Sequence, residues 1–250
     1  MLGARTSSLV AATPNAEAAV AQSVREMLGL TRAALSDDDA IAAVLDPAKN
    51  HYLGETLNLT SMAKLTRALN HATYTFRKKL SHTADSQDQR HRMTPGSRPV
   101  LVNHVDLGRV DVITPPLIAQ TPAALERFNA CMDRVWSAMR SLEEMGAAPE
   151  AWSYLLPNAF PVRFTESGDL MHHHHKWVAR LCFTAQEEIW RASVDEVEQV
   201  RAIHPRLGRW LLPPCGLRER AGVTPYCPEG ARYCGVPVWR KDLSEYQRTI

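Results

Sequence analysis

The sequence lacks a long apolar run, a secretory signal and a strong charge of one sign. In its 250 residues no stretch approaches the roughly 18 apolar residues that a membrane-spanning helix needs. The N-terminus lacks the compact apolar block of a signal peptide, because Thr6, Ser7 and Ser8 interrupt it. These absences predict a soluble, cytoplasmic protein that has no membrane as a partner.

The net charge is also small, at +2 with a pI near 8.3. A charge this mild argues against general binding of a nucleic-acid polymer through a basic surface. Apolar residues make up 45% of the chain, an ordinary globular share that supports a sizeable core. The sequence shows no internal repeat and no low-complexity tract, so its length fits one large domain or two small ones.

Cysteine is scarce, with five residues in the chain. An odd number in a chain of this length is typical of free thiols or metal ligands rather than of a disulfide framework. Cys131 and Cys182 fall on predicted helix faces, and we expect them in the core.

The other three cysteines, Cys215, Cys227 and Cys234, lie in a tail that is rich in Pro and Gly. Because this tail has few apolar residues to pack, a metal staple is one interpretation, with zinc bound by the three thiolates and His204. Three cysteines could also hold an iron–sulfur cluster. Ordinary buried thiols are the alternative.

Apolar spacing and capping residues predict several helices. An Ala-rich pattern indicates one over residues 15–30, and Ser36 with three following aspartates predicts the start of another, over 37–45. Further helices are expected over 57–70 and, polar in character, over 84–92.

The longest predicted helix begins at Thr121-Pro122 and stops near Gly146. Its apolar residues recur at helical spacing and are predicted to form a core face: Leu125, Phe128, Met132, Val135, Met139 and Leu142. Residues 169–203 are also expected to be mostly helical.

Alternating side chains predict strands at 73–76 and 160–165, and residues 99–113 have extended character. Residues 1–14 are small and polar without periodicity, and they are expected to be disordered or a linker.

Arg90-His91-Arg92 is the most informative segment for function. Arginine presents a planar fork of donors that suits phosphate oxygens, and histidine adds a donor that titrates near pH 7. The triplet therefore favours an anion, such as the phosphates of a nucleotide or a cofactor. A solvated basic helix face is the simpler alternative.

Four consecutive histidines, His172 to His175, lie inside the chain. On a helix only His172 and His175 share a face, since they are three residues apart. That pair is a candidate for metal binding, although a solvent-facing run is the simpler interpretation.

Two segments together resemble the flavin-dependent thymidylate synthase family. In the first, Asn70-His71 stands where the family has a Glu-His pair, Thr75-Phe76 lies in the family's strand, and Arg90-His91-Arg92 matches its basic triplet.

The second segment is longer. Leu156-Pro157-Asn158 opens it, Arg163 and Arg180 follow, and Ala185-Gln186-Glu187-Glu188-Ile189 closes it, which fits the family pattern LP…R…R…AQxEI without a gap. Together the two segments cover about residues 57–200.

The chain departs from the family in its nucleotide loop. Val100 stands where the family signature has a serine, and Ser97-Arg98 replaces an Asn-Glu pair that helps to hold the uracil nucleotide. Asp169, Met171 and His175 occupy the positions of polar flavin-binding residues. These changes fit a divergent branch of the family or one half of a duplicated protein.

The resemblance implies an α+β fold with a central, mainly antiparallel sheet flanked by long helices. Residues 15–203 would form the thymidylate synthase-like domain, and residues 204–250 an irregular C-terminal cap rich in Cys, Pro and Gly.

The resemblance also implies an activity, the reductive methylation of dUMP to dTMP by a methyltransferase. FAD would be the cofactor, NADPH the reductant and methylenetetrahydrofolate the carbon donor, in a homotetramer with sites shared between subunits. The alternatives are modification of another pyrimidine nucleotide and a non-catalytic partner that binds flavin or nucleotide.

Residue roles follow from the matched positions. Arg180 is the implied catalytic residue, since a fixed guanidinium stabilises charge on pyrimidine oxygens without proton transfer. A pair with Glu187 or Glu188 is its structural alternative. The implied flavin-binding residues are His71, Arg90, His91, Arg92, Asp169 and His175. The implied nucleotide-binding residues are Ser97, Arg98, Arg163 and Arg180.

Several of these residues have plain structural alternatives. His71 could equally be a core histidine. The turn at Ser97 and Arg98 could offer a hydroxyl, a guanidinium and backbone N–H groups to one phosphate, or it could be an ordinary surface turn. Alternation along a strand would by itself explain Arg163 as an exposed charge.

Overall fold

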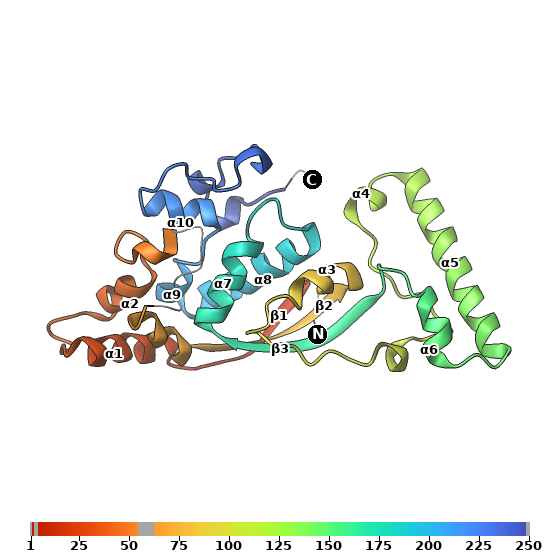
Figure 1. The fold of residues 1–250 in the computed structure, drawn as a ribbon, viewed down its shortest axis with the longest axis horizontal. Helices are drawn as coiled ribbons and strands as arrows, with labels where there is room; N and C mark the ends of the chain where they lie inside the picture. Colours follow the sequence, from red (N-terminus) through yellow and green to blue (C-terminus); the bar gives the residue numbers. More distant parts are fainter. Residues whose placement is uncertain (1, 3–4, 55–62, 249–250) are drawn as a thin grey trace.

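A three-stranded antiparallel sheet forms the centre of the computed structural model, which describes residues 2, 5–54 and 63–248. The strand order is β1-β2-β3, so the middle strand is β2 (Figure 1). The strands are β1 (Ser7–Ala12), β2 (Thr73–Ser81) and β3 (Pro161–Asp169). An antiparallel sheet with long helices confirms the expected α+β class.

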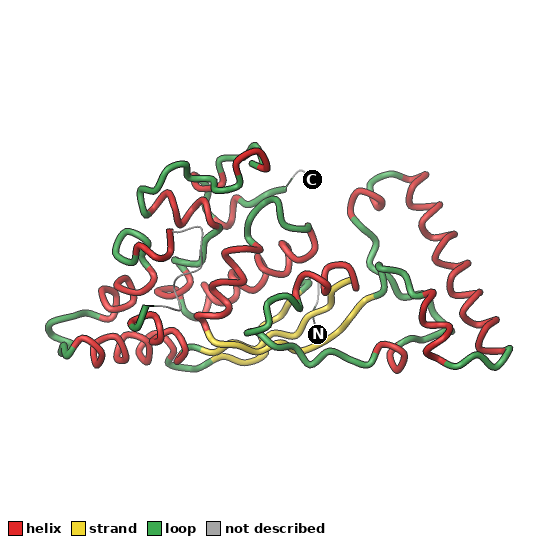
Figure 2. Tube along the Cα trace, in the orientation of Figure 1, coloured by secondary structure: helices red, strands yellow, loops and turns green. Residues whose placement is uncertain are grey.

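One face of the sheet is buried under helices. Along β2 the inward side chains alternate as Tyr74, Phe76, Lys78 and Leu80, all fully buried. Helices α7 (Leu170–Arg180) and α8 (Glu187–Ile203) lie over this face (Figure 2). Both β2 and β3 run further than the apolar alternation predicted, because charged side chains continue the buried face.

The expectation that residues 1–14 are disordered or a linker is wrong for Ser7–Ala12, which form the edge strand β1. Its backbone pairs with β2, and the backbone N–H groups of Thr6 and Ser7 both donate to Asp195 of α8. Edge pairing of this kind rests on backbone hydrogen bonds, which leave no apolar pattern in the sequence.

The predicted ends of two N-terminal helices are confirmed within a residue or two. Ser36 caps α2 by accepting a hydrogen bond from the Asp39 backbone N–H at 3.1 Å. Gly29, with φ of 67°, ends α1. The helices before the arm are α1 (Ala16–Leu28), α2 (Asp37–Leu45) and α3 (His82–Asp88).

Three other predicted elements differ in extent. In the segment predicted as a helix over 57–70, Leu65–His71 form a 3-10 helix, while 57–62 lie outside the described residues. Helix α3 ends at Asp88, so the basic triplet lies in the turn after it. The stretch 99–113 contains the 3-10 helix Leu101–His104 and no strand.

Helices α4 (Pro116–Ala119) and α5 (Pro122–Glu144) form an arm that stands away from the sheet (Figure 1). The predicted limits of α5 are confirmed, and Gly146 with φ of 83° follows its end. Only two of the six residues of the predicted core face are buried, because the arm packs mainly against loops. Met132 and Met139 are buried, but the other four apolar residues of that face are only half-buried.

The C-terminal residues consist of short helices and turns. They are anchored rather than loose, since Leu207, Leu211, Val238 and Leu243 belong to the main core. The α-helices not yet named are α6 (Pro149–Trp152), α9 (Pro205–Gly208) and α10 (Pro214–Arg220). Among the described residues, the 3-10 helices not yet named are His51–Gly54, Ser153–Leu155, Gly230–Arg232, Val238–Arg240 and Leu243–Glu245. None of the helices in the described part of the chain has the length and hydrophobicity that a bilayer crossing requires.

Candidate functional site

A cleft of about 530 Å³ opens beside α7. Its walls come from α7, from the α7–α8 loop, from the 3-10 helix His51–Gly54, and from α10 with the loop that follows it. Gln87 of α3 also lines it, as do Arg180 and His175. The volume falls in the usual range for a small-molecule or cofactor site.

Arg180 is held in this cleft by three hydrogen bonds. Its Nε donates to Nε2 of His91 at 2.9 Å, Nη1 donates to the Gln87 side-chain oxygen at 3.1 Å, and Nη2 donates to the Gln87 carbonyl at 3.2 Å. A guanidinium has five N–H donors, so two remain for a ligand. The alternative partners are engaged elsewhere: Glu187 pairs with Arg191, and Glu188 accepts from Ser81.

His91 is neutral in this arrangement. Burial, with the charges of Arg180 and Lys176, lowers the pKa of His91 to about 3. Because Nε2 accepts from Arg180, the ring proton is assigned to Nδ1. The expectation that this imidazole offers a titrating donor near pH 7 is therefore wrong. Burial also lowers the pKa of Arg180 from its ordinary value, which still leaves a cation.

The two arginines of the triplet are exposed, unlike the histidine between them. Arg90 and Arg92 are exposed, and neither lines the cleft. Their role in holding a flavin pyrophosphate stays a prediction, which two free guanidinium forks suit chemically.

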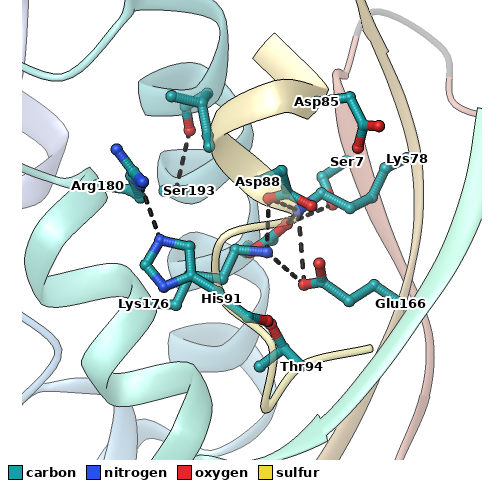
Figure 3. Close-up of polar contacts among 12 residues, drawn as sticks. Ser7, Lys78, Asp85, Asp88, His91, Thr94, Glu166, Lys176, Arg180 and Ser193 are labelled. Atoms are coloured by element: carbon teal, nitrogen blue, oxygen red, sulfur yellow. Dashed lines mark hydrogen bonds and ion pairs between the residues drawn. The ribbon is translucent and has the colours of Figure 1, made fainter. Parts of the chain in front are cut away.

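Directly beside Arg180 and His91 lies a cluster of five buried charges, here named the charge cluster: Lys78, Asp88, Glu166, Lys176 and Glu196. Figure 3 labels the first four of these residues. Lys78 Nζ lies 2.9 Å from Asp88 and 2.8 Å from Glu196. Lys176 Nζ lies 2.7 Å from Asp88 and also contacts Glu166.

Burial opposes the charges of Lys78, Asp88 and Glu196, and attraction between opposite charges in the cluster outweighs it. Although burial would lower the pKa of Lys78, Asp88 with Glu166 and Glu196 holds it well above its ordinary value. Burial would likewise raise the pKa of Asp88, but Lys78 and Lys176 keep it well below the usual range. Both residues are therefore charged across the physiological pH range.

The charge cluster positions the site. Asp88 ends α3 three residues before His91, and Lys176 lies one helical turn before Arg180. The pair between Asp88 and Lys176 thus ties together the two elements that carry the Arg180–His91 contact. Sequence reasoning missed this cluster. The sequence did contain a sign of the cluster. Lys78 and Glu166 stand at positions of β2 and β3 where the alternating pattern points side chains inward.

Two of the four histidines, His173 and His174, are buried, so the expected solvent-facing run is wrong for them, whereas His175 is exposed. These two rings pack inward from α7. Burial lowers the pKa of His174 to about 4, and its buried Nε2, beside the cleft, has no hydrogen-bond partner among the residues that the structure describes. His175 lines the cleft, with its ring 6.0 Å from that of His91.

Asp169 and His71 do not line the cleft. Asp169 caps α7 by accepting from the His172 backbone N–H at 3.0 Å, and it also binds the His172 ring. His71 is exposed at the end of a 3-10 helix, so the core alternative for it is wrong. Cofactor binding by either residue stays a prediction.

The predicted nucleotide-binding residues other than Arg180 are also outside the cleft. Arg98 binds Asp85 at 2.8 Å and Asp88 at 3.2 Å, which uses its fork inside the protein. Ser97 is exposed, and its backbone N–H donates to the Thr165 carbonyl of β3 at 2.8 Å. Arg163 is exposed on β3 and pairs with Asp111 at 2.7 Å. The structure does not bring these three side chains to Arg180.

The cysteines are all free thiols among the described residues. Cys131 is exposed, which corrects its expected place in the core, and Cys182 is partly buried. Cys182 joins the tail thiols Cys215, Cys227 and Cys234 in lining one small hollow.

The expected metal staple finds no support in that hollow. No group of three or more His, Cys, Asp or Glu side chains within the described ranges is arranged to hold a metal ion. The proposed fourth ligand, His204, is used elsewhere, since its Nδ1 lies 3.0 Å from the Tyr74 hydroxyl. Burial, with the neighbouring thiols, raises the pKa of Cys215 to about 12, which keeps this thiol protonated.

Comparison with known proteins agrees with this architecture. The family of thymidylate synthase complementing proteins matches residues 8–206, most of the chain. The chain belongs to this family. The match begins in β1 and ends just after α8, so it includes the sheet, the charge cluster and Arg180.

Among curated proteins, the flavin-dependent thymidylate synthase of Nitratidesulfovibrio vulgaris is 29% identical over 70% of this chain and 73% of its own length. Proteins of the same name from Saccharolobus solfataricus and Sulfurisphaera tokodaii are 27% and 28% identical over 60% of this chain. The chain spans 58% and 59% of those two relatives.

Proposed function

We propose that the chain catalyses flavin-dependent reductive methylation of dUMP to dTMP, with methylenetetrahydrofolate as carbon donor and NADPH as reductant. The observation that carries the proposal is the state of Arg180. It is a cation fixed by His91 and Gln87, and it keeps two N–H donors in a cleft of nucleotide size. The names of the relatives supply the reaction class.

The residues present are compatible with a flavin. Within the described part of the chain, a buried nitrogen of His174 beside the cleft has no hydrogen-bond partner, and His175 lines the cleft wall. Arg90 and Arg92 present free forks outside it, where a pyrophosphate would find donors. FAD, when bound, would supply the hydride chemistry that no side chain can perform.

The protein's own part of the reaction is electrostatic. The two free N–H donors of Arg180 would bind a phosphate or pyrimidine oxygen of the nucleotide, which stabilises negative charge without moving a proton. Neutral His91 and the Gln87 side chain fix the guanidinium plane. The charge cluster holds α3 and α7 in place, so that little reorganisation is needed when a ligand binds.

We also propose a homo-oligomer, specifically a tetramer, because the arm formed by α4 and α5 leaves apolar side chains partly exposed. Leu125 and Phe128 on α5 are only half-buried in one chain, and Leu117 on α4 is 64% exposed. A second copy that covered this arm would bury them. It could also bring the exposed Ser97 and Arg163 toward a site formed by two subunits.

The leading alternative is a non-catalytic protein that keeps the fold and the flavin site. Its support is the rewritten nucleotide loop, where Arg98 binds Asp85 and Asp88 instead of facing the cleft. Modification of another pyrimidine nucleotide is the second alternative, and it rests on the same loop.

Tritium release from dUMP labelled at C5 tests the proposal, with FAD, NADPH and methylenetetrahydrofolate present. Wild-type protein should release tritium, and Arg180→Ala should release it about a hundredfold more slowly with flavin absorbance retained. The control Arg109→Ala, at an exposed loop residue, should match wild type. Wild-type protein that binds FAD but releases no tritium would contradict the enzyme proposal and favour the non-catalytic one.

A further inference from the structure

Two arginines line the cleft, and they come from different elements. Arg180 lies on α7, whereas Arg218 lies on α10. The family match ends at residue 206, so it includes the first arginine and not the second. The region shared with the family therefore assigns no role to Arg218.

Arg218 differs from the other buried cations in the described part of the chain, because no carboxylate pairs with it. Arg25, Lys78 and Lys176 are also buried, and each forms an ion pair with an aspartate or a glutamate. Arg218 is only 8% exposed, yet no Asp or Glu among the described residues lies within ion-pair distance of it. A buried cation without a carboxylate is costly to the fold, so this charge needs another explanation.

The backbone holds the guanidinium of Arg218 in one orientation. Nε donates to the Pro225 carbonyl at 3.0 Å, and Nη1 donates to the Gly54 carbonyl at 2.8 Å. These bonds use two of the five N–H donors of a guanidinium, which leaves three. Nη2 has no partner among the residues that the structure describes, and it is not sealed from solvent. Arg218 therefore keeps donors that a ligand in the cleft can use.

The rest of the C-terminal wall is mainly apolar. Leu217 and Pro228 offer an apolar surface on the same wall, and Tyr52 adds an aromatic ring from the neighbouring 3-10 helix. The carboxylate of Glu229 also lines the cleft, but it pairs with Arg232 at 3.3 Å. A fixed cation among apolar groups suits an organic ligand that ends in a phosphate or a carboxylate.

We infer that Arg218 binds an oxyanion of a second ligand, one that occupies the cleft beside the nucleotide. The inference rests on the proposed function, which gives dUMP to Arg180 and the flavin pyrophosphate to Arg90 and Arg92. Two ligands of that reaction remain, and both carry oxyanions: NADPH has phosphates, and methylenetetrahydrofolate has the carboxylates of its glutamate. A guanidinium binds either kind of group through paired N–H donors.

Calorimetric titration of the full-length, FAD-loaded protein under anaerobic conditions tests the inference. The two probes are NADP⁺, which cannot reduce the flavin, and tetrahydrofolate, which lacks the carbon to be transferred. Arg218→Gln should weaken the binding of at least one probe about tenfold or more, because it removes a charged hydrogen-bond donor. The affinity of the same samples for dUMP should stay within about threefold of wild type, because Arg180 is unchanged.

Two further variants separate a binding role from a structural one. Arg218→Lys keeps the cation without the planar fork, so its affinity for the affected probe should lie between those of wild type and Arg218→Gln. Arg220→Gln removes an exposed guanidinium of α10 that does not line the cleft, and it should keep the wild-type affinities. Unfolding midpoints that match wild type would show that the variants are folded.

The pattern of losses identifies the oxyanion. A loss for tetrahydrofolate alone indicates a carboxylate, a loss for NADP⁺ alone indicates a phosphate, and a loss for both indicates a shared subsite.

Unchanged binding of both probes in Arg218→Gln would overturn the inference, as would wild-type protein that binds dUMP and neither probe. In both cases the binding of dUMP would leave its assignment to the cleft standing. An equal loss of dUMP affinity in Arg218→Gln would give Arg218 a purely structural role and would also overturn the inference. Wild-type protein that binds neither dUMP nor either probe would remove the proposed function and the inference together.

Discussion

The charge cluster and the cleft lie side by side on α7, yet their charged side chains differ in burial and in the number of partners. In the cluster the ammonium groups of Lys78 and Lys176 are completely buried, and each contacts two or more carboxylates. One helical turn further on, Arg180 is only half-buried and keeps two donors unused. Paired charges hold the structure together, and a charge with spare donors is available to a ligand.

The difference follows from what water can reach. A buried charge without a partner costs several kcal/mol, so the cluster must be paired within the chain. The cleft is open to solvent, and water can satisfy the spare N–H groups of Arg180 until a ligand replaces it. Substitutions in the two regions should therefore affect different properties.

The largest effect is expected from breaking the cluster. Lys176→Met leaves the three buried carboxylates of the cluster with one buried ammonium, that of Lys78, so Asp88 and Glu166 lose their contacts with Lys176, which should cost about 3–5 kcal/mol of unfolding free energy. Urea denaturation measures this change. The control Lys241→Met, at an exposed residue, should stay within about 0.5 kcal/mol of wild type. A loss below 1 kcal/mol for Lys176→Met would contradict the structural role of the cluster.

A smaller effect is expected from acid. The folded pKa of His174 is about 4, below the unfolded value of 6.5, so protons bind the unfolded chain first as the pH falls. The stability contributed by neutral His174 is present above pH 6.5 and is lost toward pH 4, which amounts to about 2 kcal/mol at pH 5. Unfolding free energies measured from pH 7 to pH 5 report this loss.

Two matched variants isolate the pH-dependent stability that comes from His174. His174→Phe removes one titrating group and should reduce the fall in stability between pH 7 and pH 5 by about 2 kcal/mol, leaving the part that comes from His91. His104→Phe, which replaces an exposed ring, should leave the slope unchanged. Equal slopes in all three proteins would show that His174 titrates normally.

In the cleft, an exchange of cation type should act on binding and not on stability. Arg180→Lys keeps the charge but loses the planar fork, so the affinity for dUMP should fall about tenfold or more. The unfolding free energy should change by less than about 1 kcal/mol, because the residue is only half-buried. Calorimetry and urea denaturation on the same samples separate the two quantities.

The smallest effect is expected at the surface. Arg191 pairs with Glu187 at 2.7 Å on the first turns of α8, and the arginine is 54% exposed. Arg191→Ala should change stability by less than about 0.5 kcal/mol, as exposed pairs of this spacing usually do. A larger loss in urea denaturation would show that this pair is coupled to the rest of the site.

Elements with strong local signals were predictable from the sequence. The cap at Ser36 and the stop at Gly146 depend on a few neighbouring residues, so composition and spacing located α2 and α5. Strand β1 was not predictable, because its pairing with β2 spans more than sixty residues and rests on backbone groups.

The candidate site was predictable in part. The family pattern located Arg180, and the structure places it in a cleft that His175 also lines, with Arg180 in contact with His91. The pattern could not show that Arg98 forms ion pairs with Asp85 and Asp88, or that α10 forms one wall of the cleft. Both facts depend on contacts between distant segments, such as Arg218 with Gly54. The roles of His71, Asp169 and the exposed arginines stay predictions.

A crystal structure of the protein with FAD and dUMP is the most direct test of the central claim, that Arg180 holds a nucleotide in this cleft. The account predicts a nucleotide oxygen within about 3 Å of Nη1 or Nη2 of Arg180, with the bonds to His91 and Gln87 retained. A nucleotide bound elsewhere, with Arg180 in contact only with His91 and Gln87, would contradict it.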